Sequence, residues 1–322
     1  MTQPYYKPSG KFAGVYFLYY VLFTFICVPI LSAIYIYLIH YIPFIYLNVL
    51  IAIGCGVALG YMMLFAAKNG KARNPAVVLL LSILALLIMK YIQWCIYIPL
   101  IYDNVYEVFY PGLTLGERFV ESAYLFVRPG LVYELAAEIN EFGAWSFGDN
   151  DVNGVMLLVV WTVEFLIMAV CALVIPRLVA KKPFSEEQGN WYTEMDRVIE
   201  VDLPPNFDDI KRSMENGDFT GFMQLAKSAK TNYGQFIRLR FHRPPQPSAL
   251  EPHYLCIEKV VLGQKNNKTG APLVKYIAIG GHLVNELTST HAAQNPVYSQ
   301  PPGAPPGAPG APGAPPPPRQ YG

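Results

Sequence analysis

Four long apolar segments, separated by short polar intervals, account for most of the chain as far as Ala180. They cover residues 14–39, 43–67, 75–101 and 152–176. A helix rises about 1.5 Å per residue, so about 20 apolar residues are enough to cross a hydrocarbon core of roughly 30 Å. Each segment exceeds that length, and the pattern therefore predicts four transmembrane helices.

The first segment contains no charged residue and is longer than the apolar stretch of a cleaved signal peptide. We therefore expect it to remain as a membrane span, preceded by a short cytoplasmic N-terminus at residues 1–13. Pro29 stands near its middle and should bend the helix, because proline removes a helical hydrogen bond. Only residues 40–43 separate this segment from the next one, which predicts an antiparallel helical hairpin.

The second segment carries Ala52, Gly56 and Gly60 at intervals of four residues. Small residues at this spacing form one helix face, on which another helix backbone can approach closely. Two interpretations stay open: a packing face between helices of the same chain, or an interface in a homo-oligomer.

Lys90 and Glu164 are the two charged residues inside the predicted spans. A charged side chain at mid-membrane costs about 2.5–3.5 kcal/mol to insert, so it usually faces protein or water and has a partner. Counted from the basic ends of their spans, the two residues lie at depths that differ by about 3 Å. They could form a structural ion pair, belong to a proton or ion path, or be unrelated to each other.

Charge outside the spans is distributed unevenly. The N-terminus, residues 68–74 and the stretch after Arg177 are basic, whereas residues 103–151 are strongly acidic. Loops that are rich in Lys and Arg stay on the cytoplasmic side of a membrane. We therefore expect a multi-pass protein of the plasma (inner) membrane, with both termini in the cytoplasm and residues 103–151 outside.

The acidic interval contains two amphipathic helical patterns. Thr114 and Glu117 form a capping-box signature, and apolar residues follow it at helical spacing. Residues 128–130 end this pattern, and a second one runs to Gly143 with glutamates on its polar side. Two interpretations stay open: an outer helical lid (103–151) packed on the bundle, or a pair of helices inserted into the lipid interface.

Asp149, Asp151 and Asn153 match the first half of an EF-hand calcium loop. The twelfth position of such a loop normally supplies a bidentate glutamate, but here it is Val160. We therefore expect a turn and an N-cap for the fourth span, and calcium binding is the weaker alternative.

Residues 183–295 alternate between strand-like and helical patterns and predict a small soluble α+β domain. The expected strands cover 197–203, 236–242, 254–262 and 273–279, with helices at 206–216 and 218–229 between the first two strands. Residues 296–322 are rich in Pro, Gly and Ala without a regular period. We expect a disordered tail there rather than a collagen strand.

One predicted strand carries a row of basic residues. Arg238, Arg240 and His242 alternate along it, and Arg243 follows. The row is either a solvated strand face or a contact for an anionic partner such as a phospholipid headgroup. The sequence shows no Cys/His set with zinc spacing and no nucleophile–base constellation. We therefore expect no metal, no cofactor and no enzymatic activity.

Composition agrees with this organisation. Hydrophobic residues make up 53% of the chain and charged residues only 15%, against about 25% in soluble domains. The net charge of +1 argues against nucleic acid as the main partner, because there is no strong field to attract phosphates. The five cysteines include no paired set in a polar loop, so free thiols are expected.

The predicted fold class is a membrane-embedded four-helix bundle with two outer amphipathic helices, a cytoplasmic α+β domain and a disordered tail. We expect a membrane-anchored interaction, assembly or regulatory protein whose cytoplasmic domain binds a protein partner. Anionic lipid and a second copy of the chain are further candidate partners. The alternative function is a transporter or channel component that uses Lys90 and Glu164.

Overall fold

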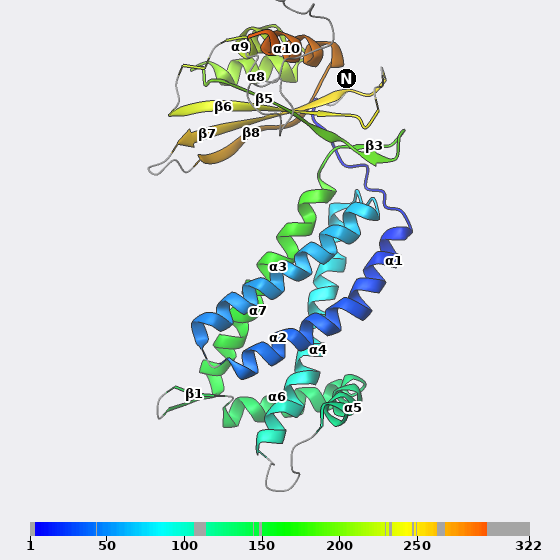
Figure 1. The fold of residues 1–322 in the computed structure, drawn as a ribbon, viewed down its shortest axis with the longest axis vertical. Coiled ribbons are helices and arrows are strands. Elements are labelled where there is room, and N and C mark those ends of the chain that lie inside the picture. Colours follow the sequence, from blue (N-terminus) through cyan, green and yellow to red (C-terminus); the bar gives the residue numbers. More distant parts are fainter. Residues whose placement is uncertain are drawn as a thin grey trace, which may run out of the picture. The chain divides into compact units, whose positions relative to one another are not determined.

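A computed structural model describes residues 4–42, 44–105, 114–143, 145–147, 150–228, 230–231, 234–246, 248, 250–262 and 268–294. The chain forms two compact units (Figure 1). One lies within Lys7–Tyr192 and contains the long helices. The other combines Met1–Tyr6 with Thr193–Gly322 and contains the larger sheet. The predicted tail, 296–322, lies outside the described residues.

Four helical stretches among the described residues are long and apolar enough to cross a membrane. They are Val15–Tyr41, Tyr46–Asn69, Pro75–Ile101 and Gly154–Ala180. The four long apolar helices predicted from the sequence are thus confirmed, and their length and composition indicate a membrane protein.

The first stretch is not a uniform α-helix. It comprises α1 (Val15–Leu22), a π-helical turn η1 (Phe23–Cys27) and α2 (Val28–Tyr41). The N–H of Val28 bonds to the Phe23 carbonyl, one residue further back than in an α-helix. Pro29 follows directly, and its ring would collide with a carbonyl in a regular α-helical turn, so the wider turn accommodates it.

The remaining long helices are α3 (Ile45–Asn69), α4 (Pro75–Val105) and α7 (Gly154–Ala180). α3 packs along α7, and α4 contacts both α2 and α7. Asn74 caps α4, because its Oδ1 accepts hydrogen bonds from the backbone N–H groups of Ala76 and Val77, each at 3.1 Å.

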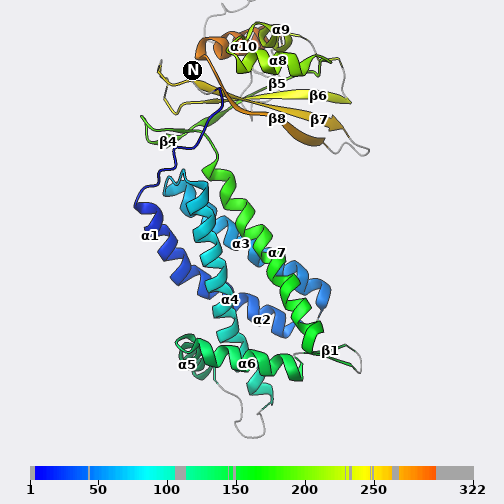
Figure 2. The same cartoon turned by 180° about the vertical axis from the view of Figure 1, so that it is seen from behind.

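Two shorter helices lie at the end of the bundle opposite the loop between α3 and α4. They are α5 (Leu115–Phe126) and α6 (Pro129–Phe142), and α5 begins with the predicted capping box of Thr114 and Glu117. α6 runs across α4 and reaches the start of α7 (Figure 2). There the Asn140 side chain donates a hydrogen bond to the Gly154 carbonyl at 2.9 Å.

The second unit is built on an antiparallel sheet with the strand order β5-β6-β7-β8. The strands are β5 (Thr193–Asp202), β6 (Gln235–Arg243), β7 (His253–Leu262) and β8 (Lys268–Ile279). Helices α8 (Phe207–Glu215), α9 (Thr220–Ala226) and α10 (Gly281–Gln294) lie on one face of the sheet (Figure 1). The sequence pattern did not predict α10.

The core of this unit follows the two-residue period of its strands. Ile237, Leu239 and Phe241 alternate along β6, are fully buried, and belong to one core with side chains of the helices. Arg238 and Arg240 therefore point to the opposite face of the sheet, which these helices leave uncovered.

The N-terminal residues belong to the same sheet. Tyr5 forms an antiparallel bridge with Ile277, and the flanking hydrogen bonds run from Tyr6 N–H to the Tyr276 carbonyl and from Ala278 N–H to the Pro4 carbonyl. The Tyr5 hydroxyl also donates to a carboxylate oxygen of Glu215 on α8. Residues 4–6, which precede the first long helix, therefore form an extra edge segment of a sheet whose strands all follow the last one.

Candidate functional site

Lys90 lies near the middle of α4 and is partly buried. Its Nζ atom is 5.9 Å from the centre of the Tyr35 ring on α2. A cation at this distance from an aromatic face is weakly attracted to it. One turn earlier on α2, the buried Ser32 hydroxyl donates to the carbonyl of Met89 at 3.4 Å.

α3 contributes a thiol to the same region. Cys55 Sγ lies 3.8 Å from Gln93 Nε2 and 3.8 Å from Met89 Sδ. Gln93 is itself buried, almost one turn beyond Lys90 on α4. Side chains of α2, α3 and α4 therefore form a polar group, the Lys90 cluster, which consists of the partly buried Lys90 and the buried Ser32, Tyr35, Cys55 and Gln93.

Two buried polar atoms of the Lys90 cluster have no hydrogen-bond partner among the described residues. They are the Tyr35 hydroxyl and Gln93 Oε1. An unpaired polar group in an apolar interior costs free energy, and such groups usually contact water, an ion or a ligand. The cluster thus combines a cation, a hydroxyl and an amide oxygen that can bind a water molecule or another small polar species.

Glu164 on α7 does not join this cluster through an ion pair. Among the described residues, the ion pairs within 4.0 Å do not include one between Lys90 and Glu164. Lys90 and Glu164 lie at similar depths along the bundle. The rotation of each helix about its own axis, however, decides which neighbouring helix a side chain faces. A functional link between Lys90 and Glu164 stays a prediction.

The small residues of α3 lie against α7 of the same chain. A Cβ atom at Gly56 would lie 2.8 Å from the Cα and carbonyl oxygen of Met168, and one at Gly60 would lie 2.8 Å from the Cys171 carbonyl oxygen. Ala52, one turn earlier, is also buried. A contact between two copies through these glycines would require α7 to move away.

The loop between α3 and α4 is tied to the segment that follows α7. Arg73 forms an ion pair with Glu186 at 3.3 Å, and its guanidinium lies 4.3 Å from the centre of the Phe184 ring. Ser9 Oγ donates to the other carboxylate oxygen of Glu186 at 2.6 Å. Arg73 thus contacts the Glu186 carboxylate and the Phe184 ring, and Glu186 links it to Ser9 of the N-terminal segment.

A short hairpin presents these side chains. It consists of β3 (Phe184–Ser185) and β4 (Asn190–Trp191), and the indole N–H of Trp191 donates to the Lys68 carbonyl at 2.8 Å. Sequence reasoning missed this hairpin. The signal was the pair of aromatic residues on either side of a turn containing Gly189, whose φ of +63° is easily adopted only by glycine.

The predicted basic row on β6 is largely paired with acidic residues of neighbouring strands. Arg238 contacts Glu200 at 2.8 Å, while Arg240 contacts Glu194 at 3.1 Å and Glu258 at 3.4 Å. The row therefore carries less free positive charge than the sequence suggests, and an anionic-lipid contact through it stays a prediction. The other two members, His242 and Arg243, continue β6, and the His242 ring lies 5.2 Å from that of Tyr276.

Burial and hydrogen bonding determine the charge state of this uncovered sheet face. Burial raises the pKa of Glu200, but hydrogen bonds from Lys230 and Arg238 outweigh it, so the pKa lies below its usual value. Burial raises the pKa of Cys256 to about 11 and that of Tyr276 to about 12. At neutral pH the face therefore carries paired charges beside a neutral thiol and a neutral phenol.

The calcium-like sequence forms a turn before α7. β1 (Trp145–Phe147) pairs with β2 (Asn150–Val152), and Asn153 stands at the N-cap of α7 without a capping hydrogen bond from its side chain. Asp149 lies outside the described residues, and Asp151 is on β2. Within the described part, no group of three or more His, Cys, Asp or Glu side chains is arranged to hold a metal ion.

No protein-family model matches the chain, and the comparisons with curated proteins and with solved structures give no match either.

Proposed function

We propose that the protein is a polytopic membrane protein that holds a protein partner at the membrane through its α+β unit. The observation that carries this proposal is the arrangement of the sheet. The described helices α8, α9 and α10 cover one face, and the other face bears a row of paired charges together with aromatic side chains. We take this uncovered face as the partner-binding surface.

The chemistry of the uncovered face suits a protein partner. Arginine and aromatic residues are enriched in protein interfaces, because they combine apolar area with hydrogen-bonding groups. Val198 on β5 pairs with Arg240 in the sheet and is 44% exposed, which places an apolar side chain beside the charged row.

The connections of the chain support an anchoring role. The α+β unit contains residues from both sides of the helical bundle, since Tyr6 precedes α1 and Thr193 follows α7. The bundle thus secures the unit at two points of the chain. The basic residues of the loop 68–74 and of the stretch after Arg177 support a cytoplasmic location for it.

A site-specific crosslinking experiment tests this proposal. A photo-reactive amino acid in place of Val198 should crosslink a defined protein in native membranes, because this position is exposed on the uncovered face. The matched control is the same substitution at Asp208, which is exposed on α8 at the other side of the unit. Equal crosslinking patterns at both positions, or none at Val198, would contradict the proposal.

A second function, the movement of a proton or a small ion through the bundle, is supported by the Lys90 cluster. Buried polar atoms without a partner, next to a cation, are typical of paths for ions or protons in membrane proteins. Replacing Lys90 by Met should preserve the fold and abolish ion flux in proteoliposomes. Lys68→Met, in the last turn of α3, is the control. Unchanged flux in Lys90→Met, or no flux in the unmodified protein, would remove this candidate.

A further inference from the structure

α5 turns most of its large apolar side chains away from the bundle. Leu115 is 75% exposed, Phe119 74% and Val120 66%. Leu125 is the buried residue of this helix, and it packs with Cys95 and Ile98 of α4. An amphipathic helix that covered the bundle in water would do the opposite and bury its aromatic side.

The two sides of α5 follow from its helical period. With 3.6 residues per turn, Leu115, Phe119, Val120 and Phe126 spread over one broad side of the helix, and Leu125 lies nearly opposite the middle of that side. The side that contains Leu125 is attached to the bundle. The Tyr91 hydroxyl on α4 strengthens this attachment by donating to the carbonyls of Leu125 at 3.1 Å and Phe126 at 2.8 Å. The apolar side is therefore free to meet something other than the bundle.

α6 provides an internal comparison, because it is oriented in the usual way. Val132 and Ile139 are buried against α4 in the same apolar cluster that holds Leu125. Glu134 lies on the exposed side of the helix. α6 therefore packs on the bundle as a lid with its acidic side outward, and the inverted orientation belongs to α5.

The point at which α5 is attached lies near the edge of the membrane core. Tyr91 stands about 24 Å along α4 from Pro75, and the hydrocarbon core of a bilayer is roughly 30 Å thick. Between Pro75 and Tyr91, helix α4 also exposes apolar side chains such as Leu84 and Leu87. The apolar side of α5 thus lies at the same level as surfaces of the bundle that face lipid.

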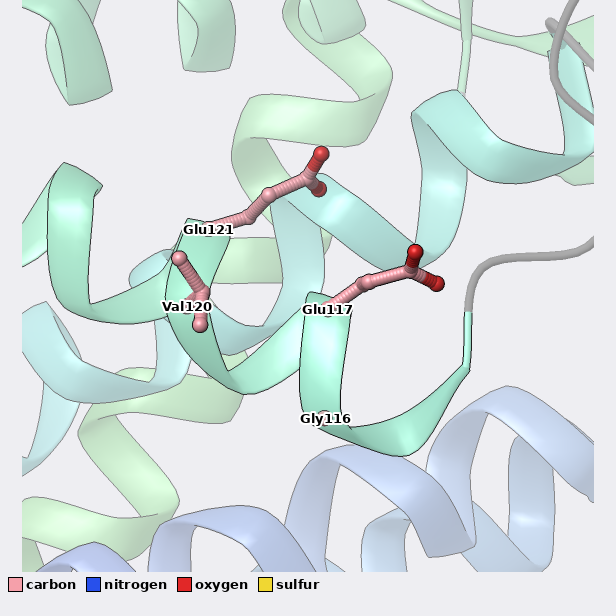
Figure 3. A pocket seen from close by; sticks show the side chains of 4 residues that line it. All are labelled: Gly116, Glu117, Val120 and Glu121. Atoms are coloured by element: carbon pink, nitrogen blue, oxygen red, sulfur yellow. The ribbon is translucent and has the colours of Figure 1, made fainter.

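A boundary between apolar and acidic surfaces runs along α5. Gly116, Glu117, Val120 and Glu121 line an open hollow of about 320 Å³ on this helix. Figure 3 shows the two glutamates extending in the same direction, away from the side chain of Val120. One side of α5 is thus acidic and hydrated, and the other is apolar, as in a helix that lies in the plane of a membrane surface.

We propose that α5 lies in the membrane interface, with Leu115, Phe119 and Val120 among the acyl chains of the leaflet at this end of the bundle. The lipid partner is zwitterionic, because the glutamates beside the apolar side repel anionic headgroups. α5 is thus a lipid-contacting helix and α6 is the lid. This lipid contact is independent of the partner-binding surface on the sheet.

Site-directed spin labelling tests the proposal in the full chain. Phe119→Cys and Glu134→Cys are each labelled with a nitroxide in a background without the five native cysteines, and are reconstituted in phosphatidylcholine vesicles. The label at position 119 should be more accessible to oxygen, which concentrates in lipid, than to a water-soluble nickel complex. The label at position 134 should show the reverse order.

Two results would overturn the proposal. A label at position 119 that meets the nickel complex more than oxygen would place this side of α5 in water. A label that is accessible neither to oxygen nor to the nickel complex would show that a second copy or another protein covers the helix.

A tryptophan variant keeps the test valid if the cysteine-free background does not fold. Phe119→Trp, in the chain with its native cysteines, should lose fluorescence in vesicles of brominated phosphatidylcholine to a greater extent than Glu134→Trp. The signal of the unmodified chain is subtracted from both, because the native tryptophans contribute to it. Equal quenching of the two added tryptophans would contradict a position of α5 among acyl chains.

Discussion

Neighbouring glycines of α3 show how strongly one residue position depends on its surroundings. Gly56 stands where a Cβ atom would lie 2.8 Å from the backbone of Met168, whereas nothing lies within 4 Å of a Cβ atom at Gly54. Both glycines reduce the intrinsic stability of the helix, but only Gly56 permits the close approach of α7. The two positions therefore respond differently to the same substitution.

We expect Gly56→Ala to lower the free energy of unfolding by about 1–3 kcal/mol, because the methyl group forces α3 and α7 apart. Gly54→Ala should raise it by about 0.5–1 kcal/mol, since alanine has the higher helix propensity and meets no neighbour. Thermal unfolding of the two variants in the same detergent measures the difference. Equal shifts would show that α3 and α7 do not pack as closely as the structure indicates.

Glu200 makes the stability of the α+β unit depend on pH in the acidic range. Its pKa is lower in the folded state than in the unfolded state, where it is about 4.3. The folded protein therefore gains stability from the ionised carboxylate above that value and loses it as the pH falls through the folded pKa.

Replacing Glu200 by Gln should destabilise β5 and β6 by on the order of 1 kcal/mol at pH 7, because the carboxylate is only partly shielded from solvent. The free energy of unfolding of the variant should also fall less steeply than that of the unmodified protein as the pH drops below about 5. Hydrogen exchange of β6 amides at several pH values measures both effects. Asp196→Asn, at an exposed position of β5, is the matched carboxylate-to-amide control.

At the scale of elements, the local signals were reliable. The capping residue Thr114, the break between α5 and α6, and strands β5 to β8 lie close to the predicted positions. These features depend on a few consecutive residues, so a single sequence contains them. The hairpin of β3 and β4 and helix α10 were missed, because short or weakly patterned elements are stabilised mainly by tertiary contacts.

The attachment of α5 to α4 combines the apolar packing of Leu125 with hydrogen bonds from the Tyr91 hydroxyl. Tyr91→Phe removes its two hydrogen bonds to the end of α5, at a cost of about 1–2 kcal/mol. We expect faster hydrogen exchange within residues 114–126 and little change in α3. Tyr133→Phe, on α6, is the control, because the Tyr133 side chain is 77% exposed. Unchanged exchange in Tyr91→Phe would mean that apolar packing alone holds α5.

At the scale of the whole molecule, residues from before the helical bundle and residues from after it belong to one unit. The N-terminal segment adds an edge to β8, and its Tyr5 hydroxyl bonds to Glu215. Sheet edges present unpaired N–H and C=O groups, and covering them protects against unwanted pairing. The N-terminus therefore contributes to the stability of a sheet whose other strands are distant in sequence.

We expect deletion of residues 2–6 to destabilise the α+β unit while the helical bundle remains folded. Hydrogen exchange should accelerate in β8 around Tyr276 and Ala278, whose backbone groups lose their partners. Tyr5→Phe should cause a smaller effect, because it removes the bond to Glu215 and keeps the backbone pairing. Exchange in β8 that is unaffected by the deletion would show that the segment is not paired in solution.

The sequence by itself determined the four apolar spans, the amphipathic character of α5 and α6, and most strands of the α+β unit. Length, periodicity and capping are local properties of the chain, and they decide which residues share a face of an element. Tertiary structure decided what each face meets: Lys90 lies beside Tyr35 rather than in an ion pair with Glu164, the apolar side of α5 points away from the bundle, and the N-terminus pairs with β8. These outcomes depend on the rotation and partner of each element, which the packing of the whole chain sets at once.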